Sequence, residues 1–279
     1  MAVRVVTDST CDLPRDIVDR LGITVVPLIV RFGQDAYLDG IEMDSETFFN
    51  RLVNDKSFPH TSQPPVEAFR ETYESIGETG DDIVSLHVSS RLSGTLNSAS
   101  IAREDAPRGI RIELIDSYSA SIGLGAVVVE AAEVAQRGAS LDEVTAAARK
   151  AMDRTGLAVA LDTLEYLQKG GRIGRAKALL GSLLSTKPLI HFEGGEVAPL
   201  GRVRTWKKAL ARIEELAIEH PHAKRMYVIC GTNIAEAEEF IDSVRRSLPH
   251  TEFRVCNFGP VVGTYSGPHT LGVCWVERE

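Results

Sequence analysis

Two short stretches rich in hydroxyl side chains carry residue types that can bind an anion. The first contains Thr61 and Ser62, and the second contains Ser93, Gly94 and Thr95. Each stretch lies where an extended segment is expected to give way to a helix. Because the first backbone N–H groups of a helix have no partner within the helix, they can hold a negatively charged group together with nearby hydroxyls. The same residue types also cap helices, so the two stretches indicate an anion site without identifying the anion.

The elements that would position these stretches alternate between strand and helix in the first half of the chain. The predicted strands cover 3–7, 23–30, 83–88 and 111–115, and the predicted helices cover 13–21, 44–53, 65–76, 94–103, 119–135 and 141–154. Strands that alternate with helices pair in parallel through right-handed crossovers. Pro27 favours an edge or a bulge for its strand, because proline has no backbone N–H to donate. We therefore expect a mostly parallel open sheet flanked by helices.

Polar residues follow three of these predicted strands. They are Asp8-Ser9-Thr10, the segment Ser89 to Thr95, and Asp116-Ser117. In open α/β sheets, ligands bind beyond the carboxyl ends of the strands. Each segment alone is typical of a turn or a cap, but three of them at one sheet edge favour a binding rim.

The second half of the chain predicts a separate α/β domain that begins after Gly156, giving domains 1–156 and 157–279. Its predicted strands cover 157–161, 225–229, 253–257 and 271–276, with helical pieces over 164–184, 206–218 and 235–247. Residues 188–192 and 197–204 flank the turn Glu193-Gly194-Gly195-Glu196, which is typical of a hairpin. A hairpin among strands and helices indicates a mixed sheet.

Composition excludes several classes of protein. The 279 residues carry a net charge of −8, which argues against a nucleic-acid-binding protein that neutralises phosphates. No run of about 18 apolar residues is present to span a membrane, and the start of the chain does not resemble a signal peptide. The four cysteines are widely spaced without a Cys-x-x-Cys pair, which favours reduced thiols and a cytoplasmic location.

Phrases spread along nearly the whole chain resemble the DegV family of long-chain fatty-acid-binding proteins. The phrases lie at 7–13, 61–64, 89–95, 116–117, 164–174, 187–188, 202–204, 259–264 and 267–268. They occur in the family's order, and the phrase from Leu164 to Gly174 is specific.

This resemblance implies a lipid-binding protein of two α/β domains that is not itself an enzyme and needs no cofactor. A fatty acid such as palmitate or oleate would lie in a buried tunnel, with its carboxylate at Thr61 and Ser93 and with Arg172 close to the head group. The binder would take part in lipid transport or fatty acid metabolism by presenting its ligand to an ATP-dependent fatty acid kinase. Arg202 would belong to the face that meets this kinase.

The chain departs from the family's pattern at one position of the predicted head-group site. The family commonly has a histidine where this sequence has Tyr265, and a glycine where it has His269. A tyrosine can donate one hydrogen bond, but it cannot become cationic near neutral pH as an imidazole can. Carboxylate binding should therefore survive, whereas the handling of an acyl phosphate is put in doubt. His269 is either an exposed loop residue or a replacement for the missing imidazole.

Three other functions compete with lipid binding. Ser93 would be the nucleophile of an acyl-ester hydrolase, but its surroundings do not match the Gly-x-Ser-x-Gly elbow, and His87 lies in a strand pattern. The glycines and cations of residues 170–177 suit a phosphate or nucleotide, but their spacing matches neither the P-loop nor the dinucleotide fingerprint. The pair His220 and His222 has no further metal ligand in view.

Overall fold

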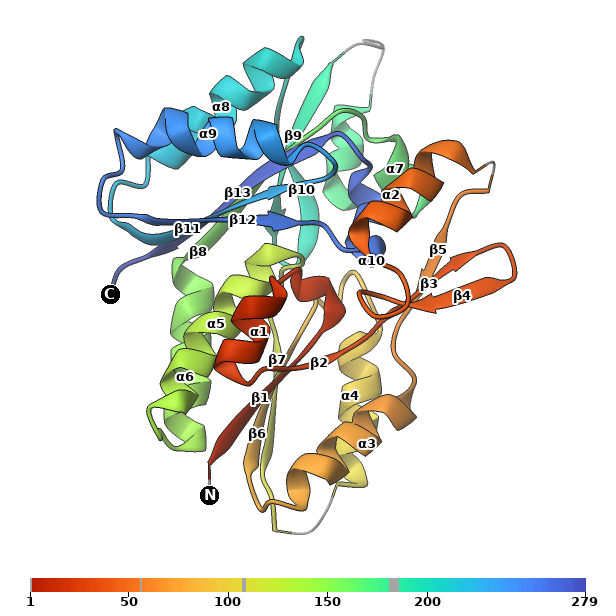
Figure 1. The fold of residues 1–279 in the computed structure, drawn as a ribbon, viewed down its shortest axis with the longest axis vertical. Helices are drawn as coiled ribbons and strands as arrows, with labels where there is room; N and C mark the ends of the chain where they lie inside the picture. The colour runs from red at the N-terminus through yellow and green to blue at the C-terminus, as the bar shows by residue number, and fades with distance from the viewer. Residues whose placement is uncertain (1, 56, 107–108, 181–185) are drawn as a thin grey trace.

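The computed structural model describes residues 2–55, 57–106, 109–180 and 186–279 (Figure 1). Its first sheet is parallel throughout, with the strand order β2-β1-β6-β7. The strands are β1 (Val3–Asp8), β2 (Thr24–Val26), β6 (Asp82–His87) and β7 (Ile112–Asp116). This arrangement confirms the parallel sheet that the alternation of strands and helices predicts.

Helices cover both faces of the parallel sheet. Those that contribute to its two hydrophobic faces are α1 (Arg15–Leu21), α3 (Val66–Gly77), α4 (Thr95–Glu104), α5 (Ile122–Gln136) and α6 (Leu141–Arg154). Helices α3 and α4 pack on one face, where Phe69 and Tyr73 are buried against Ile83. Helices α1, α5 and α6 pack on the other face.

The second sheet is mixed, with the strand order β10-β9-β8-β13-β11-β12. Its strands are β8 (Thr155–Leu161), β9 (Lys187–Glu193), β10 (Glu196–Val203), β11 (Ala223–Cys230), β12 (Glu252–Asn257) and β13 (Thr270–Glu277). Strands β9 and β10 form the predicted hairpin, and β11 and β12 are the parallel pair. Helices α8 (Trp206–Ile218) and α9 (Ile234–Arg245) cover one face of this sheet. The mixed α/β sheet is therefore confirmed.

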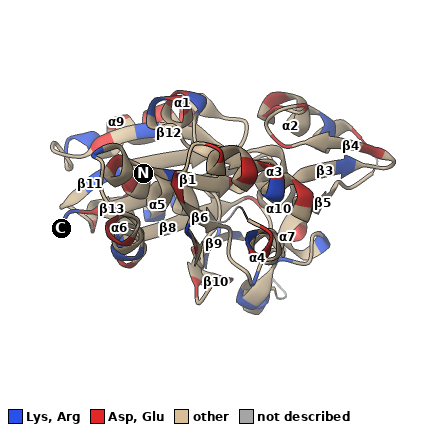
Figure 2. Ribbon diagram, turned by 90° about the horizontal axis from the view of Figure 1, so that it is seen from below, with Lys and Arg blue, Asp and Glu red and all other residues tan. Residues whose placement is uncertain are grey.

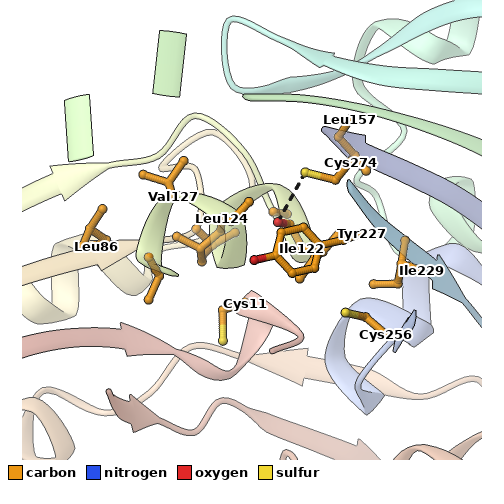
Figure 3. Packing of buried hydrophobic residues seen from close by; sticks show 14 of the residues in the cluster. Cys11, Leu86, Ile122, Leu124, Val127, Leu157, Tyr227, Ile229, Cys256 and Cys274 are labelled. Atoms are coloured by element: carbon orange, nitrogen blue, oxygen red, sulfur yellow. Dashed lines mark hydrogen bonds between the residues drawn. The ribbon is translucent and has the colours of Figure 1, made fainter. Parts of the chain in front are cut away.

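Helix α5 joins the two halves of the molecule through one hydrophobic core. Its residues from Ile122 to Ala132 are all buried, as expected of a helix that is apolar all round. Figure 3 shows Ile122 and Leu124 between Leu86 of the parallel sheet and Tyr227 of the mixed sheet. The predicted domain boundary at residue 156 stays a prediction, and the core runs across it.

The prediction of one strand over residues 23–30 is wrong, because the structure divides these residues between β2 and a small antiparallel sheet. This sheet has the order β4-β3-β5, with β3 (Ile29–Phe32), β4 (Asp35–Leu38) and β5 (His60–Ser62), and it lies beside α2 (Ser45–Asn54) on the right of Figure 1. The chain leaves the parallel sheet at Pro27, and the N–H of Leu28 donates to the Ser9 hydroxyl instead of a strand partner. Proline at this point therefore divides the predicted strand between two sheets.

Short helices complete the fold near the centre of the molecule. They are the 3-10 helices η1 (Ser9–Cys11) and η2 (Gly174–Leu179), and the α-helices α7 (Glu165–Lys169) and α10 (Pro260–Ser266). The predicted helical region 164–184 thus contains two short helices, while residues 181–184 lie outside the described part of the chain. Helix α10 lies in a phrase for which no secondary structure is predicted, because its seven residues are few and include glycine, threonine and two valines, which are weak helix formers.

Candidate functional site

A cavity of 440 Å³ opens where the two halves of the chain meet. Six of the seven predicted binding residues line it, namely Thr61, Ser62, Ser93, Gly94, Arg172 and Tyr265. They come from four separate segments, which are β5, the loop between β6 and α4, the loop after α7, and α10. The seventh residue, Thr95, is absent from the lining, and its hydroxyl lies 2.8 Å from the Ser93 hydroxyl. Whether these residues contact a ligand stays a prediction.

The parallel sheet explains how two of these segments come together. The Asp8 carboxylate at the end of β1 accepts a hydrogen bond from the N–H of Val88, just after β6. The Asp116 carboxylate at the end of β7 accepts from the N–H of Ser90. The three polar strand ends therefore meet at one edge of the sheet, as the sequence predicts. Of these, Thr10 and Ser93 reach the cavity, whereas Asp116 does not line it.

Tyr265 and Thr61 join the two halves of the chain at the polar end of the cavity. Their hydroxyl oxygens lie 2.5 Å apart, so one of them donates to the other. The Arg172 guanidinium lies 5.3 Å from the centre of the Tyr265 ring, and its Nε donates to the carbonyl of Leu92. Arg172 also donates from Nη1 to the Gly170 carbonyl. Within the described residues, Nη2 is left without a partner, so a cation with unused donors stands beside these hydroxyls.

Gly94 precedes α4 and is its cap residue, with no side-chain cap bond. A Cβ at this position would lie 2.1 Å from Oε1 of Gln63, so the glycine lets the Gln63 amide pack against the backbone. Gln63 lines the cavity and donates from Nε2 to the Ser98 hydroxyl. It belongs to the first hydroxyl-rich stretch, but the sequence gives no reason to select it over its neighbours.

The mixed sheet forms one apolar wall of the cavity, which runs from the head-group end toward the other end. Because side chains alternate along a strand, Leu157, Val159 and Leu161 of β8 share the face that lines the cavity. Ile190 of β9 pairs with Val159 in the antiparallel ladder, and Phe192 lies two residues further along the same face. One end of the cavity is therefore polar and cationic, while the other is a wall of aliphatic and aromatic side chains.

Two buried carboxylates hold the N-terminus of α10, and sequence reasoning missed both. Asp12 accepts hydrogen bonds from the N–H of Gly259 at 2.8 Å and from the Ser121 hydroxyl at 2.6 Å. Asp39 accepts from the Ser9 hydroxyl at 2.7 Å. Burial raises the pKa of Asp39 to about 7, and burial also raises the pKa of Asp12.

These carboxylates position Tyr265 indirectly. They accept hydrogen bonds from the backbone at the start of α10, and α10 carries Tyr265. Their partners lie more than 200 residues away along the chain, at Gly259 for Asp12 and Val261 for Asp39. Only the phrase Thr7 to Leu13 pointed to Asp12, and no sequence signal pointed to Asp39.

His269 does not replace the missing imidazole in this structure. It is absent from the cavity lining, and its ring packs against Trp206 at a tilt of 36°, with the ring centres 4.1 Å apart. Its Nδ1 lies 3.3 Å from the Asp162 carboxylate, and its side chain is 44 % exposed. Tyr265 therefore stands alone where the family commonly has a histidine.

The hydrolase alternative lacks a base beside Ser93 in the described residues. His87 is fully buried, and its two nitrogens contact Asp8 at 3.0 Å and Ser85 at 2.7 Å. This Asp-His-Ser arrangement has the order of a catalytic triad, but it is sealed within the parallel sheet, where no ester could reach Ser85. His87 is thus a packed core residue, as its strand pattern indicates.

The other two alternatives also find little support. In residues 170–177, Arg175 pairs with Glu193 at 2.7 Å and Arg172 turns to the cavity. His220 contacts Glu277 at 2.7 Å and stacks on Trp275. The described ranges contain no group of three or more side chains arranged to hold a metal ion.

Three further observations concern the surface charges, the position of Arg202 and the length of the helices. Figure 2 shows acidic and basic residues interspersed along helices such as α1, rather than separated into faces of one sign. Arg202 is exposed on β10, away from the cavity, and its contact with a kinase stays a prediction. Among the residues that the structure describes, we find no helix with the length and apolarity needed to cross a membrane.

Comparison with known proteins decides the family. A family model described as "Uncharacterised protein, DegV family" matches residues 2–278. The chain belongs to the DegV family. A DegV domain-containing protein of Streptomyces coelicolor is 40% identical over 280 residues, covering 99% of each chain.

Solved structures of the DegV family share the whole fold. The crystal structure of DegV from Bacillus subtilis, described as a fatty acid binding protein, superposes with a TM-score of 0.92 at 33% identity and covers 100% of both chains. A stearic-acid-binding protein from Eubacterium ventriosum gives a TM-score of 0.90 at 27% identity, covering 99% of this chain and 98% of its own.

Proposed function

We propose that this DegV-family protein binds a long-chain fatty acid in the 440 Å³ cavity and does not act as an enzyme by itself. The observation that carries the proposal is the division of the cavity into a cationic, hydroxyl-lined end and an apolar end. This division matches an amphipathic ligand with one anionic head. Its volume lies within the range of roughly 300–1,000 Å³ typical of small-ligand sites. The relatives described as binding fatty acids support the same ligand class.

The carboxylate occupies the polar end. A fatty acid is ionised at neutral pH, so its buried head group must be paired or hydrogen-bonded. Arg172 supplies the positive charge, and the hydroxyls of Thr61, Ser93 and Tyr265 supply donors at the same end. The Ser62 hydroxyl is buried without a partner among the described residues, and a carboxylate oxygen would satisfy it.

The tail supplies most of the binding free energy. Each buried methylene contributes about 0.8 kcal/mol, so a palmitoyl chain gives on the order of 10 kcal/mol before ordering costs are subtracted. The carboxylate therefore contributes more to the orientation of the ligand than to its affinity.

Native mass spectrometry of the freshly purified protein tests the proposal first. We expect a bound mass that is released on denaturation as a long-chain fatty acid, and we expect the delipidated protein to bind palmitate and oleate. Hexadecan-1-ol keeps the tail but lacks the carboxylate, so it should bind more weakly than palmitate. A protein that stays free of both fatty acids after delipidation would overturn the proposed function.

We further propose that the protein is a cytoplasmic carrier that presents its ligand to an ATP-dependent fatty acid kinase, with Arg202 on the contact face. The test is phosphorylation of protein-bound palmitate by a purified bacterial fatty acid kinase. Arg202→Glu should slow phosphorylation without changing palmitate affinity, because Arg202 does not line the cavity. Arg137→Glu, at the exposed end of α5, is the matched control. Equal rates for both variants would exclude Arg202 from the contact.

A further inference from the structure

A second cavity, of 590 Å³, lies against the apolar end of the first. Its lining includes Val127 of α5, Met152 of α6, Leu216 of α8 and Trp275 of β13. The Trp275 ring lies on Gly156, where a Cβ would come within 2.2 Å of the indole. Polar residues such as Ser117 and Ser119, from the third polar strand end, also line it. Asp153, Thr155, His191 and His220 line it as well, so the second cavity has both apolar and polar walls. It has no role in the proposed head-group site.

Two side chains, Leu157 and Phe192, line both cavities. The antiparallel ladder between β8 and β9 explains why the partition lies there. Its last pair is Ala158 with His191, and beyond this pair the two strands are no longer hydrogen-bonded to each other. Leu157 still pairs with Cys274 of β13 on its other side. The second cavity therefore opens at the point where β9 separates from β8, and Leu157 and Phe192 stand across the gap.

The partition lies at the end of the cavity away from the head-group helix. Leu161, at the other end of β8, pairs with Thr270, four residues after the last residue of α10. Leu157 and Leu161 are four residues apart on β8, a distance of about 13 Å along a strand. A fatty acid whose carboxylate lies at Tyr265 would therefore direct its methyl end toward Leu157 and Phe192.

We propose that Leu157 and Phe192 form a gate that sets the longest acyl chain the protein accepts, and that the second cavity receives the methyl end of chains that pass it. This inference rests on the proposed function and adds a specificity site to it. The ligand class is a long unbranched acyl chain, because Leu157 and Phe192 are the side chains that line both cavities among the described residues, and a branched chain would not fit between them. Beyond the gate, Val127 of α5 and Met152 of α6 offer methylene groups an apolar surface, and methylene groups need no hydrogen-bond partner.

A series of saturated acids from tetradecanoic to tetracosanoic acid tests the gate by titration calorimetry. For the wild type, the Kd should fall about fourfold with each added methylene until the cavity is full, and then rise. Phe192→Ala should move this turning point to longer acids and tighten docosanoic acid by about tenfold or more. Ile190→Ala is the matched control, because Ile190 lies two residues away on the same strand face but lines only the first cavity.

Fluorescence gives a second readout that locates the methyl end. Trp275 and Trp206 are the two tryptophans of the chain, and only Trp275 lines the second cavity. In a Trp206→Phe background, a long fatty acid brominated near its methyl end should quench Trp275 strongly in Phe192→Ala. The same acid should quench it weakly in Ile190→Ala, where the gate is intact.

The outcomes separate this inference from the proposed function. If wild-type protein binds no fatty acid, the proposed function fails and the gate fails with it. If palmitate binds to all variants but the turning point is the same in Phe192→Ala and Ile190→Ala, only the gate is wrong. Quenching of Trp275 in Phe192→Ala together with a shifted turning point supports it.

Discussion

The polar and apolar ends of the first cavity are built in opposite ways. The polar end gathers Thr61, Ser93, Arg172 and Tyr265 from four segments that are far apart in the sequence, three of them in loops or very short elements. The apolar wall has a regular part from β8 and β9, two neighbouring strands of one sheet, to which other segments add residues such as Leu28 and Val261. The orientation of a ligand therefore depends on contacts between distant segments, whereas much of the contact with an acyl tail is built into the regular alternation of side chains along two strands.

The largest expected effect comes from shortening the tail. Octanoate has eight methylenes fewer than palmitate, so it should bind more weakly by up to about 6 kcal/mol, at about 0.8 kcal/mol per methylene. The carboxylate is unchanged, so the whole loss belongs to the apolar end. Titration of the delipidated protein with both acids measures it. If octanoate loses less binding free energy relative to palmitate than hexadecan-1-ol does, the carboxylate contributes more to affinity than the tail, and the assignment is wrong.

The next effect concerns the carboxylates beneath the polar end. Burial raises the pKa of Asp39 to about 7, so the folded protein holds this proton more tightly than the unfolded chain, in which the pKa of an aspartate is about 3.9. The stabilisation is complete below pH 4 and is lost as the pH rises to 7, by up to about 4 kcal/mol at about 1.36 kcal/mol per pKa unit.

The variant Asp39→Asn stays neutral, so its free energy of unfolding should fall less between pH 5 and pH 8 than that of the wild type. Denaturant unfolding at both pH values measures the difference. Asp44→Asn is a useful control, because Asp44 lies on the surface and its pKa is lowered by the N–H of Thr47. Equal pH dependence in Asp39→Asn and the wild type would show that Asp39 is ionised in the folded protein throughout this range.

Removing one head-group hydroxyl should have a moderate effect. Ser93→Ala should weaken palmitate binding by about 1–3 kcal/mol, the usual cost of leaving a buried polar partner unsatisfied. Titration calorimetry measures the loss, with Ser90→Ala as control, because Ser90 is in the same loop but does not line the cavity. An unchanged affinity in Ser93→Ala would remove this residue from the head-group site.

The smallest effect is expected at the residue where the chain departs from its family. Tyr265→Phe removes the contact with the Thr61 hydroxyl but keeps the ring beside Arg172. We expect palmitate binding to weaken by about 0.5–1.5 kcal/mol, the net value of one hydrogen bond. Tyr118→Phe, at an exposed tyrosine outside this cavity, should change nothing. A loss as large as that of tail shortening would mean that the polar end dominates affinity.

Regular elements account for most of what the sequence predicted correctly. The alternation of apolar strands and helices predicted the parallel sheet, and the turn around Gly194 and Gly195 predicted the β9–β10 hairpin. The hydrophobic pattern of a strand or helix repeats over many residues, so several residues support the same prediction. The prediction of one strand over residues 23–30 was wrong, since the part before Pro27 pairs with β1 and the part after it pairs with β4 and β5 in another sheet.

The amino-acid sequence was enough to predict the two kinds of sheet, the family, and the residue types at the head-group end. Which of these residues share a cavity depends on the tertiary structure, because α10 is held by the distant carboxylates Asp12 and Asp39, and β5 is held by β3. The tertiary structure also placed His269 on Trp206 and left Leu157 and Phe192 between two cavities. Hydrophobic periodicity is a property of neighbouring residues and can be recognised in the sequence, whereas a buried polar contact depends on where distant segments meet in the folded protein.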